Sequence, residues 1–216
     1  MDSLPPAASS PSLPLSGLPG WARLHGHEMA EADAAFAAGT AMKSLDDLVQ
    51  LEPLWAGCWR ARQALKCAGV AARMMGRTED ESGLRDAQLL TAPGDDPGPA
   101  GNLFLAAQKV SARSGALTTG FVRELAALMA LRWDEDLAAA AGMNDAALQS
   151  GRAVPFVMAE LIVAITARRP DAEALAFLLA DTVLAQKLKW PKPVPLLLSQ
   201  RYGPAFRTIG GRGRVR

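Results

Sequence analysis

The chain has 216 residues, with 23 Lys and Arg against 22 Asp and Glu, so its formal net charge is only +1. This length suits one domain or a tight pair of domains with a sizeable core. Half of the residues are hydrophobic, which excludes a wholly disordered chain. A net charge this close to zero gives no overall attraction to nucleic acid or to an anionic membrane.

The first residues do not form a secretory signal, because residues 1–20 carry an acid at position 2 and several prolines. The most apolar run, 154–167, contains Glu160 and is too short to span a bilayer. We therefore predict a cytoplasmic protein that does not associate with membranes. Cys58 and Cys67 lie nine residues apart on one predicted helix, on roughly opposite faces, so we expect both to be free thiols.

Helical patterns follow one another along most of the chain, because Ala and Leu dominate and β-type alternation is missing. In chain order we predict helices over 29–50, 54–76, 79–91, 100–113, 119–131, 135–141, 154–168 and 172–188. The predicted fold class is all-α, an irregular multi-helix bundle over residues 28–200. A flexible Pro/Ser-rich arm, 1–27, precedes it, and a basic Gly/Arg tail, 201–216, follows it.

Capping residues support several of these helices. Thr78 and Glu81 have the spacing of a capping box, in which each side chain satisfies a free amide at a helix start. Asp134 and Asp171 are predicted N-caps. Gly142 is predicted to end a helix by adopting a positive φ. The Gly/Pro-rich stretch 93–99 is predicted to form a loop.

The predicted helix 54–76 has two contrasting faces. Apolar residues at steps of three and four predict a buried stripe of Leu54, Cys58, Ala61, Leu65, Ala68, Ala72 and Met75. Another side gathers two indoles and four cations: Trp55, Trp59, Arg62, Lys66, Arg73 and Arg77. Such a face could bind phosphates while Trp stacks on a base. Alternatively, the indoles pack and the cations are solvated or pair with the acids of 79–86.

Carboxylates offer the candidate sites for chemistry. Glu160 is the only charge between Arg152 and Arg168, so it is either a buried acid suited to proton transfer or the partner of an arginine. Asp95 and Asp96 could hold a hard cation such as Mg²⁺, or could cap the next helix and turn the chain. We predict no cofactor and no stable metal site.

Five phrases in the sequence are distinctive as a set. They are 53–60 (PLWAGCWR), 77–81 (RTEDE), 93–101 (PGDDPGPAG), 169–175 (RPDAEAL) and 185–191 (AQKLKWP). From about Leu13 onward, the chain resembles the bacterial family catalogued as domain of unknown function one-four-zero-three. The resemblance implies no established activity, cofactor or catalytic residue. Members commonly continue beyond the position of Arg216, so the resemblance also implies a C-terminally shortened member.

Three classes of function remain open. The leading prediction is a non-catalytic helical interaction or regulatory module, with a protein partner or with self-association. The first alternative is a nucleic-acid-associated protein that uses the Trp/Arg face and the arginines of the tail, which are Arg201, Arg207, Arg212, Arg214 and Arg216. The second alternative is a carboxylate-based enzyme that uses Glu160 or the Asp95/Asp96 loop. An enzyme is the least favoured class because no nucleophile has a recognisable base near it in sequence.

Overall fold

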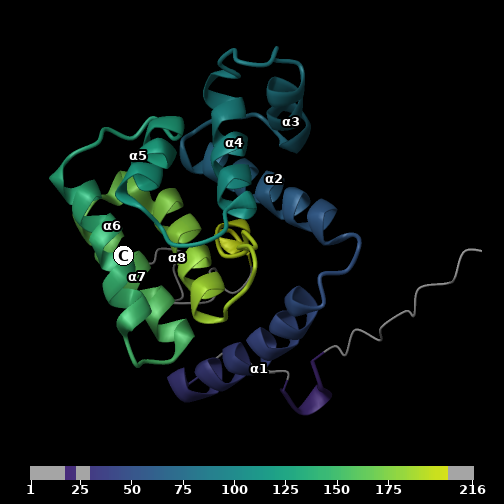
Figure 1. The fold of residues 1–216 in the computed structure, drawn as a ribbon, viewed down its shortest axis with the longest axis vertical. Helices are drawn as coiled ribbons and strands as arrows, with labels where there is room; N and C mark the ends of the chain where they lie inside the picture. The colour runs from purple at the N-terminus through teal and green to yellow at the C-terminus, as the bar shows by residue number, and fades with distance from the viewer. Residues whose placement is uncertain (1–17, 23–29, 204–216) are drawn as a thin grey trace, which may run out of the picture.

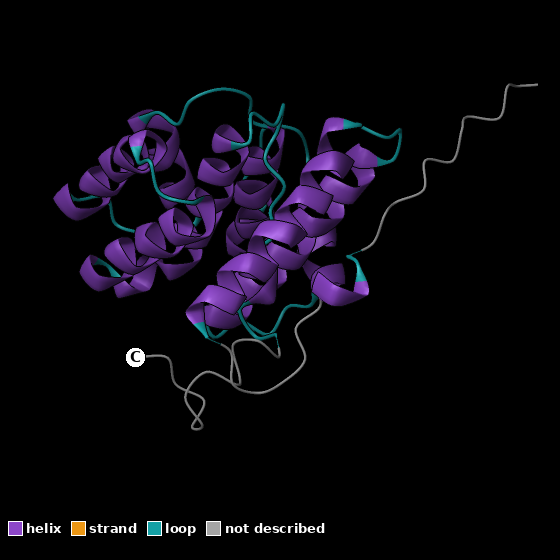
Figure 2. Cartoon of the chain, turned by 90° about the horizontal axis from the view of Figure 1, so that it is seen from below, coloured by secondary structure: helices purple, strands orange, loops and turns teal. Residues whose placement is uncertain are grey.

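The computed structural model describes residues 18–22 and 30–203. Eight α-helices lie in these residues: α1 (Glu31–Gln50), α2 (Ala56–Met74), α3 (Glu81–Leu89), α4 (Gly98–Ala112), α5 (Thr119–Leu128), α6 (Glu135–Gln149), α7 (Val154–Arg168) and α8 (Glu173–Lys187). Three 3-10 turns are added: η1 (Gly20–Ala22), η2 (Pro170–Ala172) and η3 (Leu198–Gln200). The described part contains no strand, as Figure 2 shows, so the all-α prediction is confirmed. Most of the arm predicted at 1–27 and of the tail predicted at 201–216 lies outside the described residues.

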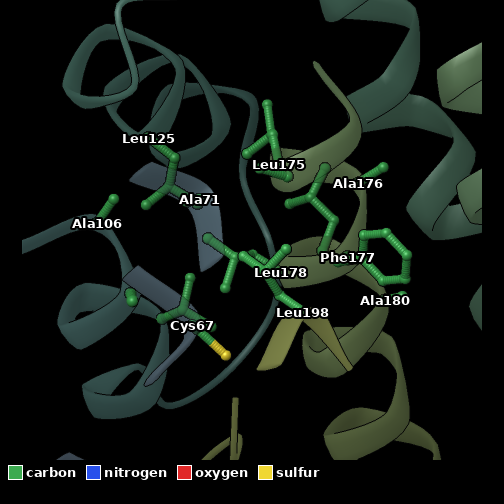
Figure 3. Packing of buried hydrophobic residues seen from close by; sticks show 14 of the residues in the cluster. Cys67, Ala71, Ala106, Leu125, Leu175, Ala176, Phe177, Leu178, Ala180 and Leu198 are labelled. Carbon is green, nitrogen blue, oxygen red and sulfur yellow. The ribbon is translucent and has the colours of Figure 1, made fainter. Parts of the chain in front are cut away.

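Helix α8 forms the centre of the fold. All twelve residues from Ala174 to Ala185 are buried. A helix that is apolar on every side must be surrounded by other elements. Figure 1 shows α5, α6 and α7 on one side of α8 and α2, α3 and α4 on the other, with α1 below them. Figure 3 shows Leu178 lying between α8 and the α2 residues Cys67 and Ala71.

Helices α2 and α4 pack closely because small residues line their contact. Ala64, Ala68, Ala71 and Ala72 of α2 are buried, as are Ala106 and Ala107 of α4. Small side chains let two helix backbones approach each other, which increases the number of van der Waals contacts. At Gly101, an added Cβ would lie 2.4 Å from the Cβ of Pro97, so this position has room only for glycine.

Arg169 fastens the end of α7 to the start of α6. Its side chain is 12% exposed and donates to Asp134 Oδ2 at 2.7 Å and to the carbonyl oxygen of Arg132 at 3.1 Å. It also binds both carboxylate oxygens of Asp171, at 2.9 and 2.7 Å. Asp134 in turn caps α6, since its Oδ1 accepts from the Leu137 amide at 3.1 Å.

Three capping predictions have different outcomes. The N-cap predicted at Asp134 is confirmed. The capping box of Thr78 and Glu81 is wrong, because α3 begins at Glu81, two residues later than predicted, and Asp80 caps it by accepting from Gly83 N at 2.8 Å. Asp171 does not cap α8, because it lies in the turn η2 and is held by Arg169.

The predicted end of a helix at Gly142 is also wrong. Helix α6 continues to Gln149, and Gly142 is not among the glycines with positive φ. Its position is exposed, and a Cβ added there would meet no atom within 4 Å. The reason for the continuation lies further on, since Asn144 is buried and Ala147 and Leu148 pack against the core. Tertiary packing therefore outweighs the local preference of glycine for a helix end.

The buried stripe predicted for α2 is wrong in most of its members. Of the seven predicted residues only Ala68 and Ala72 are buried, whereas Leu54 is 97% exposed. The reason is that α2 begins at Ala56 and turns its smallest residues toward α4 and η3. Both cysteines are free thiols as predicted, with Cys58 exposed and Cys67 buried.

Candidate functional site

Two tryptophans and three cations form a continuous line along α2. We call Trp55, Trp59, Arg62, Lys66 and Arg73 the α2 stripe. Their spacings of four, three, four and seven residues keep them on one side of a helix. Eighteen residues separate its ends, a length of about 27 Å at 1.5 Å per residue. The structure thus brings together five of the six residues that the sequence assigned to this face.

Arg77, the sixth, lies beyond the end of α2 and is directed elsewhere. Its guanidinium forms an ion pair with Glu79. The hydrogen bond from Arg77 holds the pKa of the Glu79 carboxyl below its usual range. Of the acids of 79–86 that were expected to pair with the basic helix, only Glu79 pairs with a predicted cation, Arg77. Asp86 pairs with Arg85 of α3, and Asp80 caps α3.

The N-terminal end of the α2 stripe is apolar and exposed. Trp55 and Trp59 meet edge to face, with ring centroids 6.2 Å apart and an interplanar angle of 76°. Trp59 packs against the core, whereas Trp55 is 45% exposed. Leu51 and Leu54, in the link between α1 and α2, are also exposed. Three large apolar side chains are thus exposed within five residues of the chain, a concentration that favours a binding surface.

The C-terminal end of the α2 stripe is cationic. Arg62 and Lys66 are exposed, and no carboxylate of the described residues lies within ion-pair distance of either. Arg73 is exposed and places its guanidinium 5.3 Å from the ring centroid of Tyr202. Arg62 and Lys66 thus follow the indoles along α2 and Arg73 lies at the far end, with their charges available to an anionic partner.

Glu160 is exposed and ion-paired. Its side chain is 54% exposed and pairs with Arg152, so the structure shows the arginine-partner alternative and not the buried acid. Glu160 also borders a shallow hollow of about 300 Å³ between α6 and α7, together with Met143, Ser150 and Leu161.

The loop of Asp95 and Asp96 lies directly before α4. Asp96 Oδ1 accepts from Gly98 N at 2.9 Å and from Asn102 Nδ2 at 2.8 Å, while Asp95 is exposed. Among residues 18–22 and 30–203, no group of three or more His, Cys, Asp or Glu side chains is arranged to hold a metal ion. The two histidines of the chain, His25 and His27, lie outside the described residues.

Asp181 is a buried carboxylate that was not among the predicted site residues. It is 0% exposed in the middle of α8 and accepts from Leu196 N at 2.9 Å and from Leu197 N at 3.3 Å. Burial raises the pKa of its carboxyl to about 8, although the two amides act in the opposite direction. A signal was present, since Asp181 is the only charge between Glu173 and Lys187, the same pattern that singled out Glu160.

Cys67 lies close to Asp181 on the neighbouring helix α2. It is 0% exposed, and its burial raises the pKa of the thiol well above the usual value. The negative charge of Asp181 raises that pKa further, whereas the backbone amide of Ser199 lowers it. An acid from α8 and a thiol from α2 thus lie together beneath the chain around η3.

The fold and these groups define an all-α protein with a buried central helix, an exposed Trp/cation stripe and a buried Asp/Cys pair. The chain belongs to the family described as "Protein of unknown function (DUF1403)", whose model matches residues 6–216. Searches of the curated proteins and of the solved structures gave no significant match. In the described part of the chain, no helix combines the length and apolarity needed to cross a membrane.

Proposed function

We propose that this chain is a non-catalytic helical interaction module whose α2 stripe binds an acidic amphipathic helix of a partner protein. The observation that carries the proposal is the continuity of two kinds of exposed surface. Leu51, Leu54 and Trp55 are exposed around the start of α2, and Arg62 and Lys66 follow along the same helix without a carboxylate partner in the described residues.

Each end of the stripe contributes a different part of binding. Large aromatic side chains supply most of the energy of an interface when they are covered, so Trp55 is the expected anchor. The cations add orientation and faster association with a negatively charged partner. A stripe of about 27 Å matches a helix of about 18 residues, and amphipathic helices bind such surfaces through anchors at i, i+3, i+4 and i+7.

The proposal can be tested with two synthetic peptides of 18 residues. One places Leu near one end and Glu at i, i+4 positions on the same face, and the other has the same composition in scrambled order. We expect the patterned peptide to bind with an affinity that falls as salt concentration rises, and the scrambled peptide to bind at least tenfold more weakly. Equal binding of both peptides, or binding of neither, would contradict the proposal.

Charge-reversal variants provide the matched control. Lys66→Glu should weaken peptide binding about tenfold or more, because it places a like charge in the contact. Arg85→Glu changes the same charge on an exposed residue of α3, outside the α2 stripe, and should leave the affinity unchanged. Circular dichroism should show that both variants keep the wild-type helix content.

A second candidate function is binding of single-stranded nucleic acid, which the pairing of indoles with cations favours. Three available cations allow a slope of about −2 in a plot of log affinity against log salt. We rank it second because the carboxylates of Asp80 and Glu81 are exposed just beyond α2 and would repel a polyanion. Undetectable binding of single- and double-stranded DNA and RNA at low salt would exclude it.

A carboxylate-based enzyme has the least support. Glu160 forms an ion pair with Arg152, and Asp96 accepts a hydrogen bond from the Gly98 amide at the start of α4.

We place the protein in the cytoplasm, a proposal that the two free thiols support because thiols persist in a reducing compartment.

A further inference from the structure

The chain after α8 packs on α2 and α8 through η3. We call residues 190–200 the C-terminal strap. Trp190, Val194 and Leu198 anchor it in the core, at 7%, 0% and 0% exposure. Proline occupies positions 191, 193 and 195, so three of its residues lack a backbone donor. Regular helical structure begins only at η3.

Asp181 is the group that holds the middle of the C-terminal strap. Its carboxylate accepts the amides of Leu196 and Leu197, directly before η3. The same short stretch covers Cys67, because η3 packs on α2 and the Ser199 amide faces the thiol. Any movement that hydrates Asp181 must therefore displace residues that also bury Cys67.

No cation compensates the charge of Asp181 in the described residues. From α2 it faces the thiol of Cys67, and from the C-terminal strap it faces backbone amides. The charged side chains of the other helices packed on α8 lie at the surface and are paired there. Lys109 of α4 pairs with Glu124. On α7, Glu160 pairs with Arg152 and Arg168 pairs with Asp136 of α6. The remaining acids of α6, Glu135 and Asp145, are exposed. An ionised Asp181 therefore has only two amides in the described residues to replace its lost hydration. Burying a carboxylate charge with so few partners has a large free-energy cost.

We propose that Asp181 is a proton-dependent latch: while it is protonated the C-terminal strap stays closed, and its ionisation opens the strap locally and exposes the Cys67 thiol. The opened strap lets water reach the carboxylate. The thiol becomes accessible only in that state, because it is completely buried in the closed one.

The direction of the pH dependence follows from proton linkage. The carboxyl of the closed state has a pKa of about 8, whereas a hydrated Asp in the open state has a pKa of about 3.9. Opening therefore releases a proton between these values. The equilibrium constant for opening should rise about tenfold per pH unit up to about pH 7.5 and should become constant above about pH 8.

Thiol modification measures this opening directly. In the variant Cys58→Ser, Cys67 is the only cysteine of the chain, which has two. Its modification by N-ethylmaleimide is followed by mass spectrometry from pH 5.5 to 9, and each rate is divided by the rate for the same protein unfolded in urea. This division removes the effect of thiolate formation. We expect the ratio to rise up to about 100-fold between pH 5.5 and 7.5 and then to level off.

Asp181→Asn is the decisive variant, because the amide keeps an acceptor for the strap and cannot ionise. In Cys58→Ser/Asp181→Asn the ratio should not change with pH. Hydrogen exchange of the wild type provides a second measurement that needs no folded variant. Exchange at 196–200, corrected for its intrinsic pH dependence, should rise with pH while exchange in α7 stays constant. A pH-dependent ratio in the Asn variant, or a parallel rise in α7, would overturn the proposal.

Discussion

Gly142→Ala should stabilise the protein, because Gly142 lies inside α6 and not at its end. The residue is exposed, has no positive φ, and would place a Cβ where no atom lies within 4 Å. Ala in the interior of a helix is favoured over Gly by about 0.8–1 kcal/mol. With no contact to offset this gain, the expected increase in the free energy of unfolding is about 0.5–1 kcal/mol.

The same substitution at Gly101 should have the opposite effect. Gly101 also lies within a helix, α4, but its added Cβ would lie 2.4 Å from Pro97 Cβ and 3.5 Å from the carbonyl carbon of Ala87. The contact with Ala87 is ordinary, but the proline is a rigid ring directly before α4, so relief requires the start of α4 to distort. Overpacking of this kind costs about 1–3 kcal/mol, and the gain in helix propensity recovers about 1 kcal/mol of it. A net loss of about 1–2 kcal/mol is expected.

Urea denaturation of the wild type and the two variants tests this pair. We expect unchanged m-values, a higher midpoint for Gly142→Ala and a lower midpoint for Gly101→Ala. In thermal unfolding, about 1 kcal/mol corresponds to about 2–4 °C for a chain of this length. If Gly142→Ala were as destabilising as Gly101→Ala, residue 142 would need a glycine conformation and α6 would not continue through it.

Three further predictions concern the core and the buried charges. Leu178→Ala should lower the free energy of unfolding by about 2–5 kcal/mol in urea denaturation, because Leu178 is 2% exposed at the centre of the core. Arg169→Ala should destabilise the protein at pH 7 and much less at pH 3. Folding holds the pKa values of Asp134 and Asp171 below their usual range, so the stability that these ion pairs contribute is present above the pKa values of the unfolded chain and is lost as pH falls. Equal losses of unfolding free energy at pH 7 and pH 3 would contradict this. Asp181→Asn should remove a decline in stability of about 1.4 kcal/mol per pH unit that the wild type shows between about pH 5 and 7.5, since the raised pKa of Asp181 favours the folded state only at low pH. Wild-type and Asn profiles that run parallel would refute this reasoning.

The predicted and observed helices agree closely where sequence period and caps act locally. Helix α7 matches its predicted bounds, and Asp134 caps α6 as expected, because a short polar side chain before an apolar run has one favourable partner, the free amides of the next turn. The thiol state and the helical side that carries Trp55 and Arg62 could also be predicted, since both follow from residue spacing alone.

The candidate sites could be predicted only in part. Glu160 and Asp181 have the same sequence pattern, a lone acid in an apolar helix, yet Glu160 is exposed and Asp181 is completely buried. The difference arises because α8 is enclosed by its neighbours and by the C-terminal strap, whereas α7 leaves one face at the surface. Periodicity gives the faces of a helix but not the number of neighbours around it.

The sequence by itself determined the all-α class, the approximate positions of the helices and the helical side that carries Trp55 and Arg62, because helix propensity, capping and the 3.6-residue period act over a few residues. Only the tertiary structure decided that α8 is the central helix, that α6 continues past Gly142, and that Asp181 and Cys67 lie together beneath the C-terminal strap. These features depend on contacts between residues far apart in the chain, such as Leu196 with Asp181 and α2 with η3. Burial is a property of all the packed elements together, and no local pattern specifies it.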